Sequence, residues 1–153
     1  MKLSCLLFSS VIALTSASSI ALAQPPAAAE HKETTELGEK MGAMGKAFKK
    51  LRGQINDASK NEDSLKLVAT IRENAQKAIM LTPEKAADLP AADQAKFKTD
   101  FAEKMKLLIG DVNKLYDALQ AGNNAEAAKL LEALGNDQKE GHKEFRKKKP
   151  EKK

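Results

Sequence analysis

The chain has few of the residues that build disulfide scaffolds, β-sheets and aromatic surfaces. Its 153 residues include one Cys, no Trp, one Tyr and five Phe, and aromatic residues make up only 4%. One Cys cannot form a disulfide within the chain, and basic residues without interleaved aromatic residues argue against nucleic-acid binding. The apolar residues that remain are mainly Ala, Leu, Ile and Met, which favour helices. The composition therefore predicts one all-α domain.

The first 23 residues have the pattern of a secretory signal peptide. Lys2 precedes an apolar run that ends in Ala21-Leu22-Ala23, the small-x-small form of a cleavage site. We expect cleavage before Gln24 and no membrane anchor afterwards, because Gln-Pro-Pro follows the run directly. Cleavage removes Cys5 and one of the 26 basic residues, so 25 basic and 21 acidic residues remain, a net charge of +4. The exported chain then has no thiol for a disulfide or a metal.

Four amphipathic helices are expected after a Pro- and Ala-rich lead at 24–32, which we expect to be disordered. The segments span about 33–56, 62–81, 92–121 and 124–147, and in each of them apolar residues recur every three or four positions. Pro83 ends the second segment, and residues 82–92 form the longest loop. Gly122 followed by Asn123 predicts a tight hairpin between the third and fourth segments.

This order of helices predicts an up-down-up-down four-helix bundle over residues 33–148, with a basic tail at 149–153. The start of the first helix, the end of the second, the start of the third and the end of the fourth then lie at one end. The apolar stripes and the fourth helix place the following residues at that end: Met41, Leu81, Phe97, Phe101, Met105 and His142. The inward face of the fourth helix is expected to carry Ala127, Leu131, Leu134, Gln138, His142 and Phe145.

Met41 and His142 are the residues at this end that suit a metal. A thioether and an imidazole that face each other between apolar side chains are the ligands of a six-coordinate haem iron. Both also have ordinary interpretations, Met41 as core filling and His142 as a cation near a helix C-terminus. The same faces carry no carboxylate pair, Ser/His/Asp set or Gly-rich phosphate loop, so no enzyme mechanism is indicated.

Three segments carry a resemblance to a known family, and they are Glu36-Leu37-Gly38-Glu39-Lys40-Met41, Asp100-Phe101 with Leu107-Leu108-Ile109-Gly110, and Gly141-His142-Lys143-Glu144-Phe145-Arg146. From Glu36 to Arg146 the chain resembles the cytochrome b562 family of soluble periplasmic four-helix cytochromes. The resemblance implies haem binding, electron transfer and a periplasmic location. It also places the axial ligands on Met41 and His142. Met44, one turn further along, is the rival to Met41.

The resemblance also implies secondary roles. Phe101 matches an aromatic residue of the family's haem pocket, whereas Met105 stands where a second Phe is usual. Arg146 matches an Arg near the haem propionates, where a guanidinium pairs with a carboxylate. The segment that ends at His142, Gln138-Lys139-Glu140-Gly141-His142, takes the place of the C-x-x-C-H motif of the related cytochrome c′ proteins and lacks both thiols. One haem b would therefore be held non-covalently.

The leading hypothesis is an exported electron carrier, because iron with ligands on both sides has no position for a substrate. The alternative is a haem-free exported bundle that binds other proteins or polyanions. A third possibility is a five-coordinate haem that senses gases, if Met41 does not reach the iron. We expect a monomer whose partner is an unidentified redox protein, with no nucleic acid and no membrane after cleavage. His31 is not expected to be a ligand, and the Lys147-Lys148-Lys149 run is either a solvated end or a means of steering an acidic partner.

Overall fold

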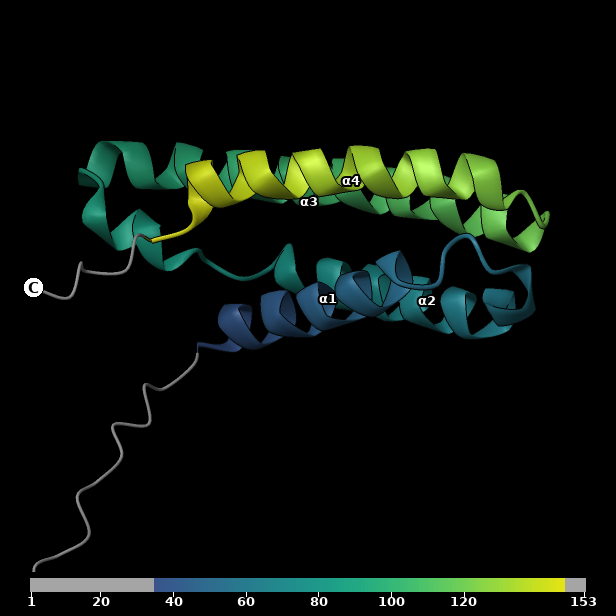
Figure 1. The fold of residues 1–153 in the computed structure, drawn as a ribbon. Coiled ribbons are helices and arrows are strands. Elements are labelled where there is room, and N and C mark those ends of the chain that lie inside the picture. Colours follow the sequence, from purple (N-terminus) through teal and green to yellow (C-terminus); the bar gives the residue numbers. More distant parts are fainter. Residues whose placement is uncertain (1–34, 148–153) are drawn as a thin grey trace, which may run out of the picture. The chain divides into compact units, whose positions relative to one another are not determined.

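The computed structural model describes residues 35–147 as a bundle of four α-helices (Figure 1). The helices are α1 (Glu36–Arg52), α2 (Asn61–Ala78), α3 (Ala91–Gln120) and α4 (Asn124–Phe145). Two short 3-10 helices, η1 (Ala58–Lys60) and η2 (Glu84–Asp88), lie in the connections. The predicted all-α, up-down-up-down four-helix bundle is confirmed. Among these helices none has both the length and the apolar character that crossing a membrane requires.

Several predictions fall on residues 1–34 and 148–153, which lie outside the described residues. They are the signal peptide at 1–23, the lead at 24–32 with His31, the outer limits of the bundle at 33–148 and the tail at 149–153. They stay predictions.

Side-chain contacts fix which ends of the helices lie together. At one end, called the His142 end below, the hydroxyl of Thr35 before α1 donates to Glu84 of η2 (2.9 Å). The ammonium of Lys85, the next residue of η2, donates to the backbone carbonyl of Glu144 in the last turn of α4. The connection between α2 and α3 therefore links the start of α1 to the end of α4, as the topology predicts.

The opposite end, called the Asn124 end, is held by the first residue of α4. The side-chain amide of Asn124 donates to the backbone carbonyl of Ile55 (2.6 Å) and to the side chain of Asn61 at the start of α2 (2.8 Å). The hairpin before it was predicted correctly. Gly122 adopts a positive φ of 72°, and the side chain of Asn123 accepts a hydrogen bond from the amide of Glu126 (3.1 Å).

The helix limits differ from the prediction mainly in the first helix, which was expected over 33–56. It begins at Glu36 because the side chain of Thr35 caps it by accepting from the amide of Gly38 (3.2 Å). It ends at Arg52, after which Gly53–Asn56 form turns closed by short-range hydrogen bonds. The second helix ends at Ala78, before the predicted 81, and η2 lies within the predicted loop at 82–92.

The core is mainly aliphatic and takes residues from all four helices. Leu51 in the last turn of α1 and Ile55 just after this helix are buried. The other fully or nearly fully buried residues include Val68, Ile71, Val112, Leu115, Leu119, Leu131 and Leu134. Met41, Leu65 and Leu108 are partly buried against this cluster. One prediction is wrong here, because His142 was placed on the inward stripe of α4 and is exposed. Gln138 is also only half-buried.

The exposure of His142 follows from the twist of the helix. Positions 11 residues apart differ by only about 20° around an α-helix, so Leu134 and Phe145 share a face, and both are buried. Steps of four residues drift by about 40° each, so the predicted line from Leu134 through Gln138 to His142 turns away from the core. His142 instead shares a face with Gly135, seven residues earlier.

Candidate functional site

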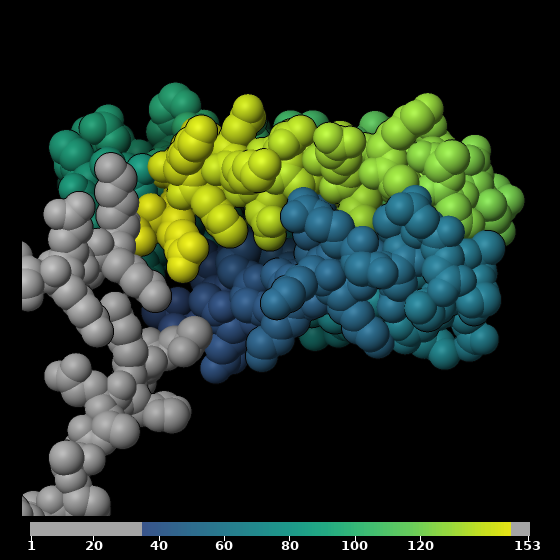
Figure 2. All heavy atoms as spheres, in the orientation of Figure 1, coloured from purple at the N-terminus to yellow at the C-terminus, as the bar shows by residue number. Residues whose placement is uncertain are grey.

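The interface between α1 and α4 is the loosest contact around the bundle. Each helix packs closely against its neighbour in sequence, α1 on α2, α2 on α3 and α3 on α4, whereas α1 and α4 do not form such a pair. Figure 2 shows the last turns of α4 (yellow) beside the first turns of α1 (dark blue). Among the described residues, the backbones of α1 and α4 therefore come less close together than those of helices that follow each other in the chain.

One point of contact sets the register between α1 and α4. A methyl group on Gly135 of α4 would lie 3.8 Å from Cε1 of Phe48 and would overlap the guanidinium of Arg52, both on α1. The guanidinium carbon of Arg52 lies 5.0 Å from the centre of the Phe48 ring. Gly135 therefore lets the side chains of α1 lie directly against the backbone of α4.

This contact places Met41 and His142 at the same level. Met41 precedes Phe48 by seven residues, and His142 follows Gly135 by seven residues. Because α1 and α4 are antiparallel, both steps lead toward the His142 end and cover about 10 Å. Seven residues are also close to two full turns, so each residue stays on the face of its helix that carries the contact. From this spacing we expect Met41 and His142 to lie at about the same level on the two helices.

Met41 and Met44 differ in their surroundings. Met41 is partly buried and packs against the edge of the core, whereas Met44 is 6% exposed and belongs to the core cluster itself. If a side chain that fills the core turned toward a ligand, it would leave a cavity behind, and such a cavity destabilises the fold. Met41 is therefore the sulfur that is better placed to bind an atom outside the core.

His142 has the properties of a neutral nitrogen ligand. Partial burial of its ring and, second, the positive charge of Arg146 lower the pKa of the imidazole, although the residue is exposed overall. Among the described residues the imidazole forms no hydrogen bond or ion pair, and the backbone carbonyl of His142 accepts from the amide of Arg146 (3.2 Å). A lowered pKa keeps the ring unprotonated at neutral pH, so a lone pair is available for a metal.

The predicted aromatic residue, Phe101, is buried in a cluster of three rings. It meets the ring of Phe145 edge-on, with 5.4 Å between centroids, and the centroid of the Phe97 ring lies 5.1 Å from that of Phe145. Met105, one turn beyond Phe101 on α3, is partly buried. Phe145 was placed on the inward face by the sequence but not in the site, and its position three residues after His142 is the signal that identifies it.

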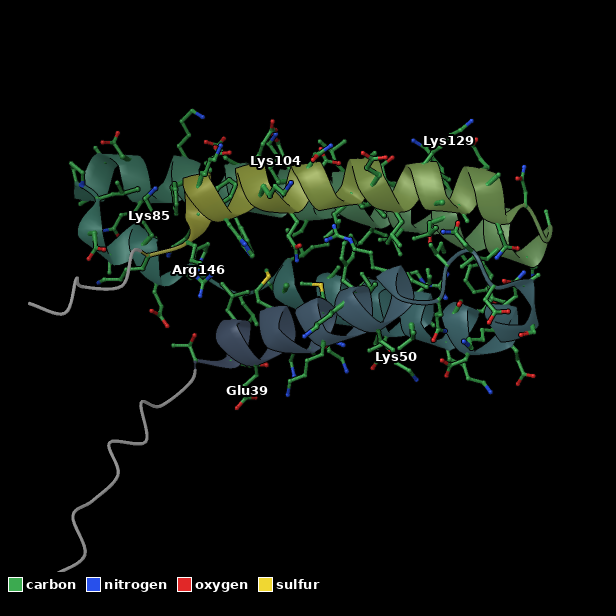
Figure 3. All side chains as sticks on the ribbon, viewed as in Figure 1. Glu39, Lys50, Lys85, Lys104, Lys129 and Arg146 are labelled. Carbon is green, nitrogen blue, oxygen red and sulfur yellow. The ribbon has the colours of Figure 1, made fainter. Side chains whose placement is uncertain are left out.

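Arg146 lies in a groove at the His142 end, separate from the core. The groove has a volume of about 270 Å³, and it is lined by Lys85, Asp88, Leu89, Lys143, Arg146 and Lys147. We call it the basic groove. Figure 3 shows Lys85 and Arg146 at this end of the molecule and Lys129 at the opposite end. The lysines of η2 and α4 that surround Arg146 are a feature that the sequence alone did not bring together.

A second groove, of about 420 Å³, lies between the last turn of α1 and the middle of α4. Its lining includes Arg52, Ile55, Leu131, Asn136 and Lys139. Its lining on α4 lies on both sides of Gly135 and includes neither Met41 nor His142. We do not assign it to the site, but it shows that α1 and α4 are loosely packed here too.

Residues 36–146 match the model of the family described as cytochrome b562. No significant match was found among curated proteins or among solved structures. The matched region spans α1 to α4 and ends one residue after Phe145, so it coincides with the bundle described above. This chain therefore belongs to the cytochrome b562 family, whose members are haem-binding electron-transfer proteins.

Proposed function

We propose that this chain holds one haem b non-covalently, with Met41 and His142 as axial ligands, and carries electrons in the periplasm. One observation carries the choice of ligands: both residues lie seven positions from the Phe48–Gly135 contact, toward the same end of antiparallel helices. The loose packing of α1 against α4 supports it, since the ligands sit on these two helices.

The two ligands differ in chemistry, and each contributes to the properties of the iron. Bound haem supplies a one-electron couple between ferric and ferrous iron. The soft thioether of Met41 favours the ferrous form and so raises the reduction potential. The imidazole of His142 binds as the neutral base, and its lowered pKa reduces competition from protons.

The surrounding residues have supporting roles in this proposal. The Phe97–Phe145–Phe101 cluster and Met105 provide apolar surface beside the ligands, which excludes water from the iron. Arg146, one turn after His142, offers a guanidinium to a propionate at the exposed edge. Met105 is smaller and more flexible than a ring, so the wall it forms adapts its shape easily.

The proposal makes the protein a carrier and not an enzyme. Met41 and His142 would hold the iron together and so would leave no place for a substrate or for oxygen. A bound haem would exchange electrons with a second redox protein, which is the partner that this function requires.

Haem titration tests the proposal directly. Hemin is added to the exported, haem-free chain and absorption spectra are recorded in the ferric and ferrous states. We expect saturation at one equivalent and the sharp ferrous bands of low-spin iron with Met and His ligands. A high-spin spectrum would instead indicate a five-coordinate haem, and no stoichiometric uptake would favour the haem-free binding protein.

A further inference from the structure

The basic groove is formed by two segments that are far apart in the sequence. Lys85, Asp88 and Leu89 come from the connection between α2 and α3. Lys143 lies in the last turn of α4, and Arg146 and Lys147 follow the helix directly. Four of the six side chains are cationic and one is anionic. The groove is therefore a concave surface with an excess of positive charge.

Most of this charge is not neutralised within the described residues. Lys147 pairs with Asp88 (2.8 Å), and this is the only ion pair found in the groove there. Lys85 donates to the backbone carbonyl of Glu144, and this carbonyl group carries no net charge. Lys143 and Arg146 form no ion pair with any described residue. On the helices, by contrast, Lys66, Lys77, Lys96 and Lys114 each pair with an acidic residue one turn away.

Part of this surface is also held in place before any partner arrives. The ammonium of Lys85 is fixed between the Glu144 carbonyl and the ring of Phe97, whose centroid is 5.8 Å away. The Lys147–Asp88 pair ties α4 to η2. Side chains that are ordered in advance lose less conformational entropy when they bind a ligand.

The groove lies next to the residue that we assign to the iron. Arg146 lines the groove and follows His142 by one turn of α4, and its charge already acts on the imidazole. A protein bound at the groove would therefore stand close to the edge of the cofactor. Short separation between redox groups is what an electron-transfer complex needs.

We propose that the basic groove is the docking surface for a carboxylate-rich face of the redox partner protein. This inference rests on the proposed electron-transfer function for its purpose, although the binding itself does not require haem. The argument is charge complementarity: the surface offers several cations around an apolar floor at Leu89, and a cluster of Asp and Glu side chains matches it. If Arg146 pairs with a propionate, Lys85 and Lys143 remain for the partner.

Hexaglutamate is a suitable probe, since it presents carboxylates without any redox chemistry. The 15N-labelled exported chain, with and without haem, is titrated with hexaglutamate at about 10 mM salt, where screening is weak. We expect amide shifts concentrated at residues 85–89 and 143–147, with affinity falling at about 0.2 M salt. Shifts spread evenly over the lysine-bearing helices would overturn the proposal.

A matched pair of charge reversals sharpens the test. Lys143→Glu changes an exposed groove residue, and Lys129→Glu makes the same change on the same helix at the Asn124 end (Figure 3). We expect Lys143→Glu to weaken hexaglutamate binding about three- to tenfold and Lys129→Glu to leave it within about twofold. Equal effects would contradict the proposal. Loss of haem uptake without loss of peptide binding would contradict the proposed function instead.

Discussion

Gly135 on α4 lies directly against Phe48 on α1, so that a methyl group at this glycine would stand 3.8 Å from the ring. The same methyl group would displace the end of the Arg52 side chain, which lies over Phe48. This relationship sets the register of the two helices that carry Met41 and His142.

The first prediction concerns the coupling between Gly135 and Arg52. Alanine at 135 gains helix propensity of about 1 kcal/mol over glycine. When Arg52 is present, the new methyl group also pushes its guanidinium away from the Phe48 ring. This removes a cation–π interaction that contributes about 0.5–1 kcal/mol to stability at an exposed site. We therefore expect Gly135→Ala alone to leave the free energy of unfolding nearly unchanged. In an Arg52→Ala background the same substitution should raise it by about 1 kcal/mol. Urea unfolding of the four chains of this cycle measures it, and identical effects in both backgrounds would show that the contact carries no energy.

The second prediction separates Met41 from Met44. Met44→Ala removes a core side chain, so we expect the haem-free bundle to lose about 2–4 kcal/mol of stability while the low-spin spectrum is retained. Met41→Ala removes a partly buried side chain, so we expect a smaller loss of stability and a change to high-spin iron. Urea unfolding and ferrous absorption spectra give the two readouts. A high-spin spectrum for Met44→Ala and not for Met41→Ala would move the ligand to Met44.

The third prediction concerns Lys85, which holds the last turn of α4. Lys85→Met removes the bond to the Glu144 carbonyl and the cation near Phe97. We expect amide hydrogen exchange at residues 142–146 to rise about threefold to tenfold, since one hydrogen bond contributes about 0.5–1.5 kcal/mol. Haem should dissociate faster as well, because His142 lies in this turn. The matched control is Lys98→Met, an exposed position on α3, where exchange in α4 should not change.

The fourth prediction is a pH dependence at Asp63. Hydrogen bonds from the Gln54 amide (2.9 Å) and then from the Lys50 ammonium hold the pKa of Asp63 below its ordinary value of 3.8. A carboxyl group whose pKa is lower in the folded chain stabilises the fold above its unfolded pKa. This contribution is lost as the pH falls through the folded pKa.

Denaturant unfolding of the haem-free chain from about pH 6 to pH 2.5 covers this window. We expect Asp63→Asn to be less stable than the wild type at pH 6 and the difference to shrink with acid. Asp137→Asn serves as the control, because this carboxylate is exposed and forms no ion pair among the described residues. A difference that stays constant with pH would show that the effect is not electrostatic.

The fifth prediction concerns export. Expression of the full chain with its first 23 residues should yield a periplasmic protein that begins at Gln24, because Ala21-Leu22-Ala23 has the form of a cleavage site. Cell fractionation and N-terminal sequencing check this. Retention of the chain in the membrane fraction would mean that residues 6–22 act as an anchor.

The fold was predictable because its signals are local. The recurrence of apolar residues every three or four positions gave the four helices, and Gly122 with Asn123 gave the hairpin, since a positive φ and a side-chain cap depend on neighbouring residues only. The start of α1 was missed by three residues, although Thr35 followed by Gly38 is itself a local cap that could have been found. The short η2 helix was missed because two prolines around it indicate only a loop.

For the candidate site, the structure bears on position only. Chain direction places the first turns of α1, with Met41, and the last turns of α4, with His142, at one end of the bundle, whereas the roles of these residues come from the resemblance and stay a prediction. The exposure of His142 was not predicted, since it depends on how far a line of four-residue steps drifts around α4.

The sequence by itself determined four amphipathic helices, their order and the end at which the thioether and the imidazole lie, because periodicity and chain direction are properties of each segment alone. Only the tertiary structure decided that Gly135 meets Phe48, that α1 and α4 pack loosely, and that Lys85 reaches Glu144 beside Arg146. These are contacts between residues distant in the chain, and they depend on the relative rotation and register of packed helices, which no single segment encodes.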